Sequence, residues 1–163
     1  LLLETYLEEC TEDQSGPSHL DLIRRLLIEG GLTQDKLDKA QNTPGNVAAI
    51  AIYKDITDRG FACHMLGAGV VEHYYSKLSP KIFDAYTKHY GMDEKQANTY
   101  KIHGPMDRQH AERAFQIIPD AVELHGWELV QESVRDAFIA TSLHYDGMLQ
   151  GAKNLIHYWD GCS

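Results

Sequence analysis

The residues best able to do chemistry lie close together in one short segment, at His103, Asp107 and His110. At about 100° per residue, these three positions fall within an arc of about 60° on one face of a helix. Two imidazoles and a carboxylate suit iron, manganese or zinc better than calcium or magnesium. The spacing therefore indicates a face with three metal ligands. Pro105 lies inside the same segment and is expected to kink or bulge the helix.

The same three side chains are also compatible with two arrangements that need no metal. One is a hydrated stripe on the surface of the protein. The other is a buried histidine paired with an aspartate in a structural hydrogen-bond network. For an isolated pattern of this kind, we favour these two arrangements over a metal site.

Further acids and one histidine on other segments favour the metal. Glu72 lies in the otherwise apolar segment GAGVVEHYY, where burial of an unpaired carboxylate is costly. Glu8 and Glu9 end the first expected helix, and His19 begins the second. Taken singly, each of these residues is an ordinary surface or capping residue. Together with the 103–110 segment, however, they supply carboxylates and imidazoles from several helices, which is how helical bundles build di-metal carboxylate sites.

In this order and spacing, these residues resemble the heme-oxygenase-like diiron oxidases and oxygenases, whose fold is shared with thiaminase II and the pyrroloquinoline-quinone biosynthesis oxidase. The resemblance covers essentially the whole chain. It implies two non-heme irons bound by six residues of this sequence, which are Glu9, His19, Glu72, His103, Asp107 and His110. Glu8 remains an alternative to Glu9, because helix phase near a terminus is uncertain by a residue.

The resemblance also implies an activity and a fold. The activity is O2-dependent oxidation of a small organic substrate, which we expect to be an amino acid or a metabolite derived from one. N-oxygenation, desaturation and C–C cleavage in a biosynthetic pathway are the implied reactions. The implied fold is an all-α, heme-oxygenase-like helical bundle, from which we expect the family's N-terminal helices to be missing. Homodimers are common in the family.

Candidate substrate-binding residues lie near the expected ligands. They are Tyr74, Tyr75, Tyr100 and Arg108, with Phe115 and Arg113 as further candidates. Aromatic residues at helical spacing are more often ordinary core. Arg108 and Arg113 would hold a substrate carboxylate, although surface pairing is the commoner role of any single arginine.

Two alternative functions stay open. The first is a metal-free enzyme of the same fold, thiaminase-like or a cofactorless oxidase, for which Cys63 is the mid-chain thiol. A lone cysteine is more often a buried apolar residue. The second is a non-catalytic helical interaction module whose histidines are incidental.

The composition narrows the class of protein. The 163 residues carry 15 Lys and Arg against 24 Asp and Glu, a net charge of −9, which argues against a nucleic-acid partner. No apolar run is long enough to span a membrane. The three scattered cysteines do not suggest a disulfide framework, so we expect a cytoplasmic protein. The length fits one domain, and we assign residues 1–163 to a single helical diiron-oxidase-like domain.

Helical spacing of apolar residues runs through almost the whole chain, with no clean alternation of period two. Ser18, Thr33 and Thr43 are expected to cap helices, and Ser79-Pro80 to separate two of them. Asp93 and Gln96 are expected to form a capping box at the start of a long helix, and Pro119 is expected to end that helix. The expected helices are 1–9, 19–29, 34–41, 44–58, 61–77, 80–90, 93–118 and 121–157, the last of which is expected to bend near Gly147 or Gly151.

Overall fold

We analysed a computed structural model of the chain, which describes residues 4–5, 18–154 and 156. Within these residues the protein is all-α, with seven helices and no strand, which confirms the predicted fold class. The helices are α2 (His19–Glu29), α3 (Gln34–Asp38), α4 (Pro44–Asp58), α5 (Phe61–His89), α6 (Asn98–Phe115), α7 (Ile118–His125) and α8 (Trp127–Ala152).

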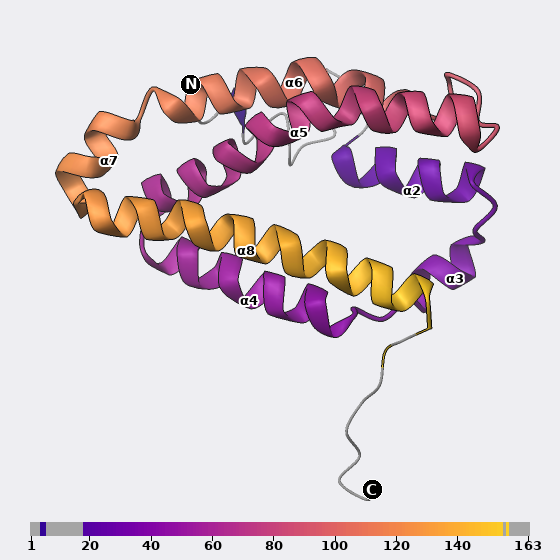
Figure 1. Cartoon of the computed structure of the whole chain (residues 1–163), viewed down its shortest axis with the longest axis horizontal. Helices are drawn as coiled ribbons and strands as arrows, with labels where there is room; N and C mark the ends of the chain where they lie inside the picture. The colour runs from indigo at the N-terminus through magenta and orange to yellow at the C-terminus, as the bar shows by residue number, and fades with distance from the viewer. Residues whose placement is uncertain (1–3, 6–17, 155, 157–163) are drawn as a thin grey trace, which may run out of the picture.

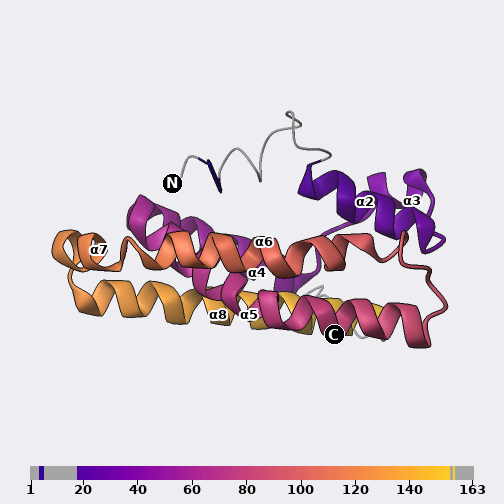
Figure 2. The ribbon, with the colours of Figure 1, turned by 90° about the horizontal axis from the view of Figure 1, so that it is seen from above.

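The helices form two main pairs, α5 with α6 and α4 with α8. Figure 1 shows α6 lying along α5, and α4 lying along α8. The first half of α5 crosses α8, so α5 connects the two pairs. The short helix α7 closes one end of the bundle between α6 and α8, and α2 packs beside α6 (Figures 1 and 2).

Local signals in the sequence set several helix starts as expected. The side chains of Ser18, Thr33 and Thr43 each accept a hydrogen bond from a backbone N–H in the first turn of the following helix. The Asp93–Gln96 box also forms, because each residue's backbone N–H donates to the other's side chain, at 2.9 and 2.8 Å. This box closes a turn before α6, which itself begins only at Asn98.

The predicted break at Ser79-Pro80 is wrong, because α5 continues from Phe61 to His89 with Pro80 inside it. The ring of Pro80 faces Gly104 of α6, where an added Cβ would lie 3.4 Å from the Cγ atom of that ring. Packing of the ring against α6 offsets the backbone hydrogen bond that proline removes. Pro105 likewise lies within one continuous helix, α6.

The C-terminal half also differs from prediction. Helix α6 ends at Phe115, so Pro119 lies in the first turn of α7, where a missing N–H is tolerated. The expected helix 121–157 is divided at Gly126, whose φ of 80° favours glycine. Helix α8 then runs unbroken through Gly147, which contacts Gly45 of α4: an added Cβ there would lie 3.1 Å from the Cα atom of Gly45.

An ion pair between Arg59, at the C-terminal end of α4, and Asp136 of α8 connects these two helices. Arg59 Nη2 lies 2.6 Å from Asp136 Oδ2, and the two side chains are only 17% and 15% exposed. Burial alone would raise the pKa of Asp136, but hydrogen bonds from Arg59 and Arg135 hold that pKa below its ordinary value. The carboxylate therefore stabilises the fold at neutral pH, and this contribution is lost as the pH falls through the lowered pKa.

Asp136→Asn is expected to reduce the free energy of unfolding by about 2 kcal/mol at pH 7. The loss should shrink as the pH falls below about 4, the ordinary pKa of aspartate in the unfolded chain, and then through the lowered pKa of the folded protein. Urea unfolding at pH 7 and at about pH 3 measures the difference. Asp84→Asn is the matched control, because Asp84 pairs with Lys88 in an exposed (i, i+4) contact and should cost less than about 0.5 kcal/mol. Equal losses in the two variants would contradict this role of the buried pair.

Candidate metal centre

The pairing of α5 with α6 positions the candidate ligands. The two helices approach closely at Gly69, where an added Cβ would lie only 2.3 Å from the Cβ atom of Ala114. One turn further along α5, Glu72 faces α6 and brings its Oε1 atom to 3.6 Å from Nδ1 of His110. Residues 38 positions apart in the sequence thus meet across a helix pair that a side chain at position 69 would separate.

The α6 face that carries the histidines points into the protein. Asp107 is 6% exposed and His110 is 2% exposed, while His103 is half-buried. A carboxylate is rarely buried this completely unless it is paired or binds a metal, and a buried imidazole needs polar partners. The burial of Asp107 and His110 therefore does not fit a hydrated surface stripe, whereas a structural network and a metal site both remain consistent with it.

His103 is oriented by the backbone of its own helix. Its Nδ1 atom lies 2.6 Å from the carbonyl oxygen of Thr99, and because a carbonyl only accepts, Nδ1 donates. The neutral ring then carries its lone pair on Nε2. Metal-binding histidines typically donate their other ring N–H to a carbonyl or carboxylate in this way. The donor set and this tautomer fit an iron ligand.

The remaining predicted ligands cannot be placed. Glu9, and its alternative Glu8, lie outside the described residues, and His19 is the first residue of α2, whose backbone alone is described there. Within the described part of the chain, no three His, Cys, Asp or Glu side chains converge closely enough to hold a metal ion. The structure thus brings Glu72 and His110 together and places His103 and Asp107 on the same face of α6.

Each of the predicted substrate tyrosines lies beside another aromatic ring. The Tyr75 hydroxyl donates to the Tyr145 hydroxyl at 2.5 Å, and the Tyr100 ring centroid lies 5.5 Å from that of Tyr86. Burial, with smaller contributions from neighbouring tyrosines, raises the pKa of both Tyr75 and Tyr100. Both phenols are therefore protonated at neutral pH and well above it.

The predicted arginines lie elsewhere. Arg108 directly follows the buried Asp107 in α6, but its own side chain is exposed. Arg113 donates from Nη1 to Thr5 Oγ1 at 3.2 Å, and its Nε atom lies 4.0 Å from Glu4. These two contacts link residues 4 and 5 to α6. Phe115 packs beside His73, with 5.6 Å between ring centroids.

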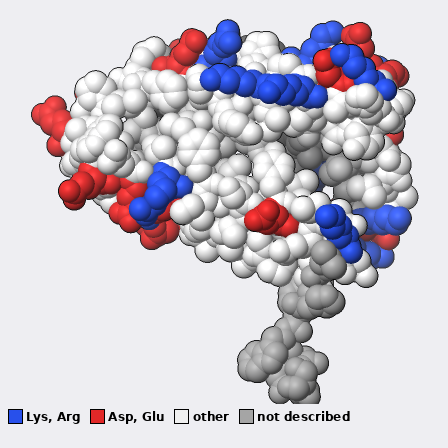
Figure 3. Space-filling model, in the orientation of Figure 1, with Lys and Arg blue, Asp and Glu red and all other residues white. Residues whose placement is uncertain are grey.

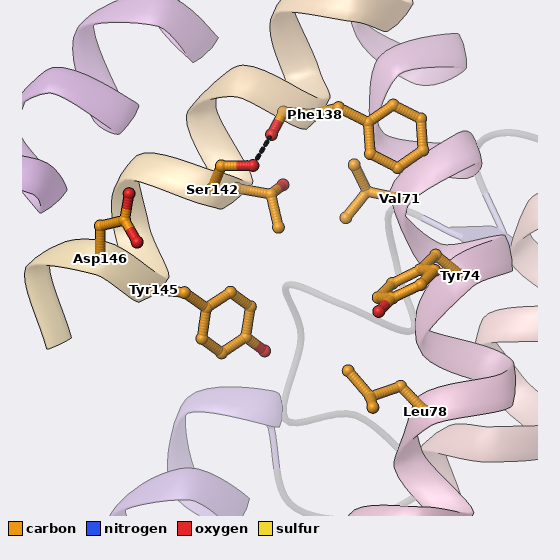
Figure 4. A pocket seen from close by; sticks show the side chains of 8 residues that line it. Val71, Tyr74, Leu78, Phe138, Ser142, Tyr145 and Asp146 are labelled. Carbon is orange, nitrogen blue, oxygen red and sulfur yellow. Dashed lines mark hydrogen bonds between the residues drawn. The ribbon is translucent and has the colours of Figure 1, made fainter. Parts of the chain in front are cut away.

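Two neighbouring cavities flank α8. The first, of about 490 Å³, lies between α5 and α8, and Figure 4 shows Tyr74 and Tyr145 pointing toward each other across it. The second, of about 370 Å³, lies between α4, α5 and α8. The face drawn in Figure 3 is mostly uncharged across its middle, with most charged side chains toward its edges. Of the predicted tyrosines, Tyr74 lines the first cavity and Tyr75 the second.

The contribution of α8 to these cavities was not predicted from the sequence. Phe138, Ser142 and Tyr145 lie three or four residues apart, which places them on one helix face. Phe138 and Tyr145 remain partly exposed on that face. An aromatic stripe interrupted by serine was the available signal, but ordinary core packing gives the same pattern.

Cys63 is completely buried in an apolar cluster with Ile56, Val71 and Ala137. A thiol in such surroundings is shielded from substrate and is not activated as a nucleophile. Its position does not support the metal-free, cysteine-dependent alternative.

An all-α bundle that places a buried imidazole and a buried carboxylate beside a second, half-buried carboxylate from another helix is the class of fold in which di-metal carboxylate sites are built. The chain belongs to the family of iron-containing redox enzymes, in the heme-oxygenase-like superfamily, because that family's model matches residues 1–145. The family identifies the chain as an oxidoreductase of this fold and iron as its metal. No curated protein and no solved structure matches it significantly. None of the described helices is long and apolar enough to cross a membrane.

Proposed function

We propose that this protein is an O2-dependent, non-heme diiron oxidase or oxygenase. Its substrate is a small organic molecule, an amino acid or a metabolite derived from one, oxidised in a biosynthetic pathway by N-oxygenation, desaturation or C–C cleavage. The observation that carries the proposal is the 3.6 Å approach of Glu72 to the buried His110 across the α5–α6 pair.

The ligands in this proposal are the six residues of the sequence pattern. His103, Asp107 and His110 come from one face of α6 and Glu72 comes from α5. Glu9 and His19 complete the set from the N-terminal segments. Two irons held there would supply the reduction of O2 and the oxidation of the substrate.

The protein's own residues prepare the site for that chemistry. The Thr99 carbonyl holds His103 in the tautomer with its lone pair on Nε2. Burial of Asp107 and His110 excludes bulk water, which strengthens every electrostatic interaction between these groups. Carboxylate ligands offset part of the charge of the metal, so the burial of several acids becomes less costly when iron is bound.

The proposal extends to the setting of the enzyme. We propose a cytoplasmic enzyme, which forms homodimers and whose partners are its small-molecule substrate and O2, with neither nucleic acid nor membrane involved. The net charge of −9 supports the exclusion of nucleic acid.

Oxygen consumption tests the proposed activity. Protein loaded anaerobically with Fe(II) is expected to consume O2 faster than the same concentration of iron in buffer. His103→Ala should abolish this excess, whereas His89→Ala should retain it, because His89 is exposed at the end of α5. If the wild type and both variants consume O2 no faster than iron in buffer, the proposed activity is wrong.

A further inference from the structure

The two cavities beside α8 are neighbours, and together we call them the α8 cleft. Val71 of α5 and Thr141 of α8 line both of them, whereas Asp146 lines only the first cavity and Tyr53 only the second. The volumes of the two cavities, about 490 and 370 Å³, are those of small-molecule binding sites in proteins.

Among the described residues that line the two cavities, the acidic side chain is that of Asp146 and there is no basic side chain of lysine or arginine. Asp146 lies at the edge of the first cavity (Figure 4). At the second cavity, the polar groups are paired with each other: His144 Nδ1 with the side-chain oxygen of Asn46, and the Tyr53 and Thr141 hydroxyls at 3.5 Å. The rest of the lining is mainly apolar or aromatic.

We infer that the first cavity of this cleft binds an organic amine with an apolar body, whose ammonium group pairs with Asp146. An apolar body fits the walls formed by Val71, Leu78 and Phe138. A free carboxylate at the same place meets a like charge and no cation. Arg108, which the sequence suggested as a carboxylate anchor, lines neither cavity.

The cleft lies beside the helix that carries one of the candidate metal ligands. Val71, which lines both cavities, directly precedes Glu72 in α5. That the amine is the substrate rests on the proposed function, whereas its binding does not.

Calorimetric titration of the metal-free full chain with three matched probes tests the inference. Hexylamine, hexanol and hexanoate share a chain length and differ in charge. Hexylamine is expected to bind most tightly and hexanoate least. Asp146→Asn should weaken hexylamine binding by about three- to fivefold, leave hexanol unchanged, and remove the salt dependence of hexylamine binding. Asp84→Asn, an exposed acid of α5 that lines neither cavity, should change none of these values.

Blocking the cleft locates the ligand. Ser142 is exposed and lines the first cavity, so Ser142→Trp should fill the cavity and abolish hexylamine binding without a change in helical circular dichroism. Hexanoate binding as tightly as hexylamine would overturn the inference. So would hexylamine binding that survives both Ser142→Trp and Asp146→Asn.

Iron uptake by the same Asp146→Asn variant separates this inference from the proposed function. Asp146 is not among the proposed ligands, so iron uptake should equal that of the wild type. If the wild type binds no iron but prefers hexylamine, the proposed function fails and the amine site stands. If iron binds and the preference is absent, the reverse holds.

Discussion

Replacing His110 with alanine is expected to lower the affinity for Fe(II) by at least about 100-fold, with loss of at least one of the two irons. The imidazole is buried, it lies 3.6 Å from Glu72, and it shares its helix face with Asp107 and His103. Its removal takes away a proposed iron ligand and leaves Glu72 and Asp107 with one fewer ligand beside them to bind the metal. Anaerobic titration with Fe(II) measures the affinity.

A second variant separates metal binding from packing. His110→Ala also removes buried volume, which by itself costs stability. His110→Gln keeps most of that volume and a hydrogen-bonding group, but is a poor iron ligand. It is expected to lose iron in the same way while its metal-free melting temperature stays closer to that of the wild type. Iron binding equal to that of His89→Ala in both variants would contradict the assignment of His110.

Replacing Gly69 with leucine is expected to reduce the free energy of unfolding by about 3 kcal/mol or more. Even the first atom of a side chain would lie 2.3 Å from the Cβ atom of Ala114, so α5 and α6 must move apart. For a chain of this size the melting temperature should fall by roughly 6–12 °C. Iron affinity should fall as well, because the same pair of helices holds Glu72 opposite His110.

The milder variant Gly69→Ala allows a rescue experiment. It should be destabilised by about 1 kcal/mol, because the clash outweighs the gain in helix propensity. The added substitution Ala114→Gly should recover most of the loss attributable to the clash. Gly104→Ala is the control, since its added Cβ meets Pro80 at an ordinary 3.4 Å. If Gly69→Ala and Gly104→Ala behave alike, the close approach at Gly69 is not as described.

The sequence predicted the features that depend on local chemistry. Helices α2 and α4 begin and end at the expected residues, because capping side chains and a proline in the first turn act within a few residues. The common face of His103, Asp107 and His110 follows from helical periodicity alone, and so was also predictable. The burial of Asp107 and His110 was not, because it depends on what packs against α6.

The errors have a common physical cause. Pro80 lies inside α5 because Gly104 of α6 leaves room for its ring, and that contact joins residues 24 positions apart. The division at Gly126 and the cleft along α8 likewise depend on how helices pack, which no local pattern encodes. Glu72 was placed at the site by family resemblance, and the structure supplies what the pattern lacked, its approach to His110.

The number of irons bound per chain decides whether this protein is a diiron enzyme. Full-length protein titrated anaerobically with Fe(II), and then examined by Mössbauer spectroscopy after exposure to O2, is expected to bind two irons per chain and to show a coupled diferric signal. His110→Gln is expected to lose this signal and His89→Ala to keep it. Uptake of no iron, or of a single iron unaffected by His110→Gln, would contradict the diiron assignment.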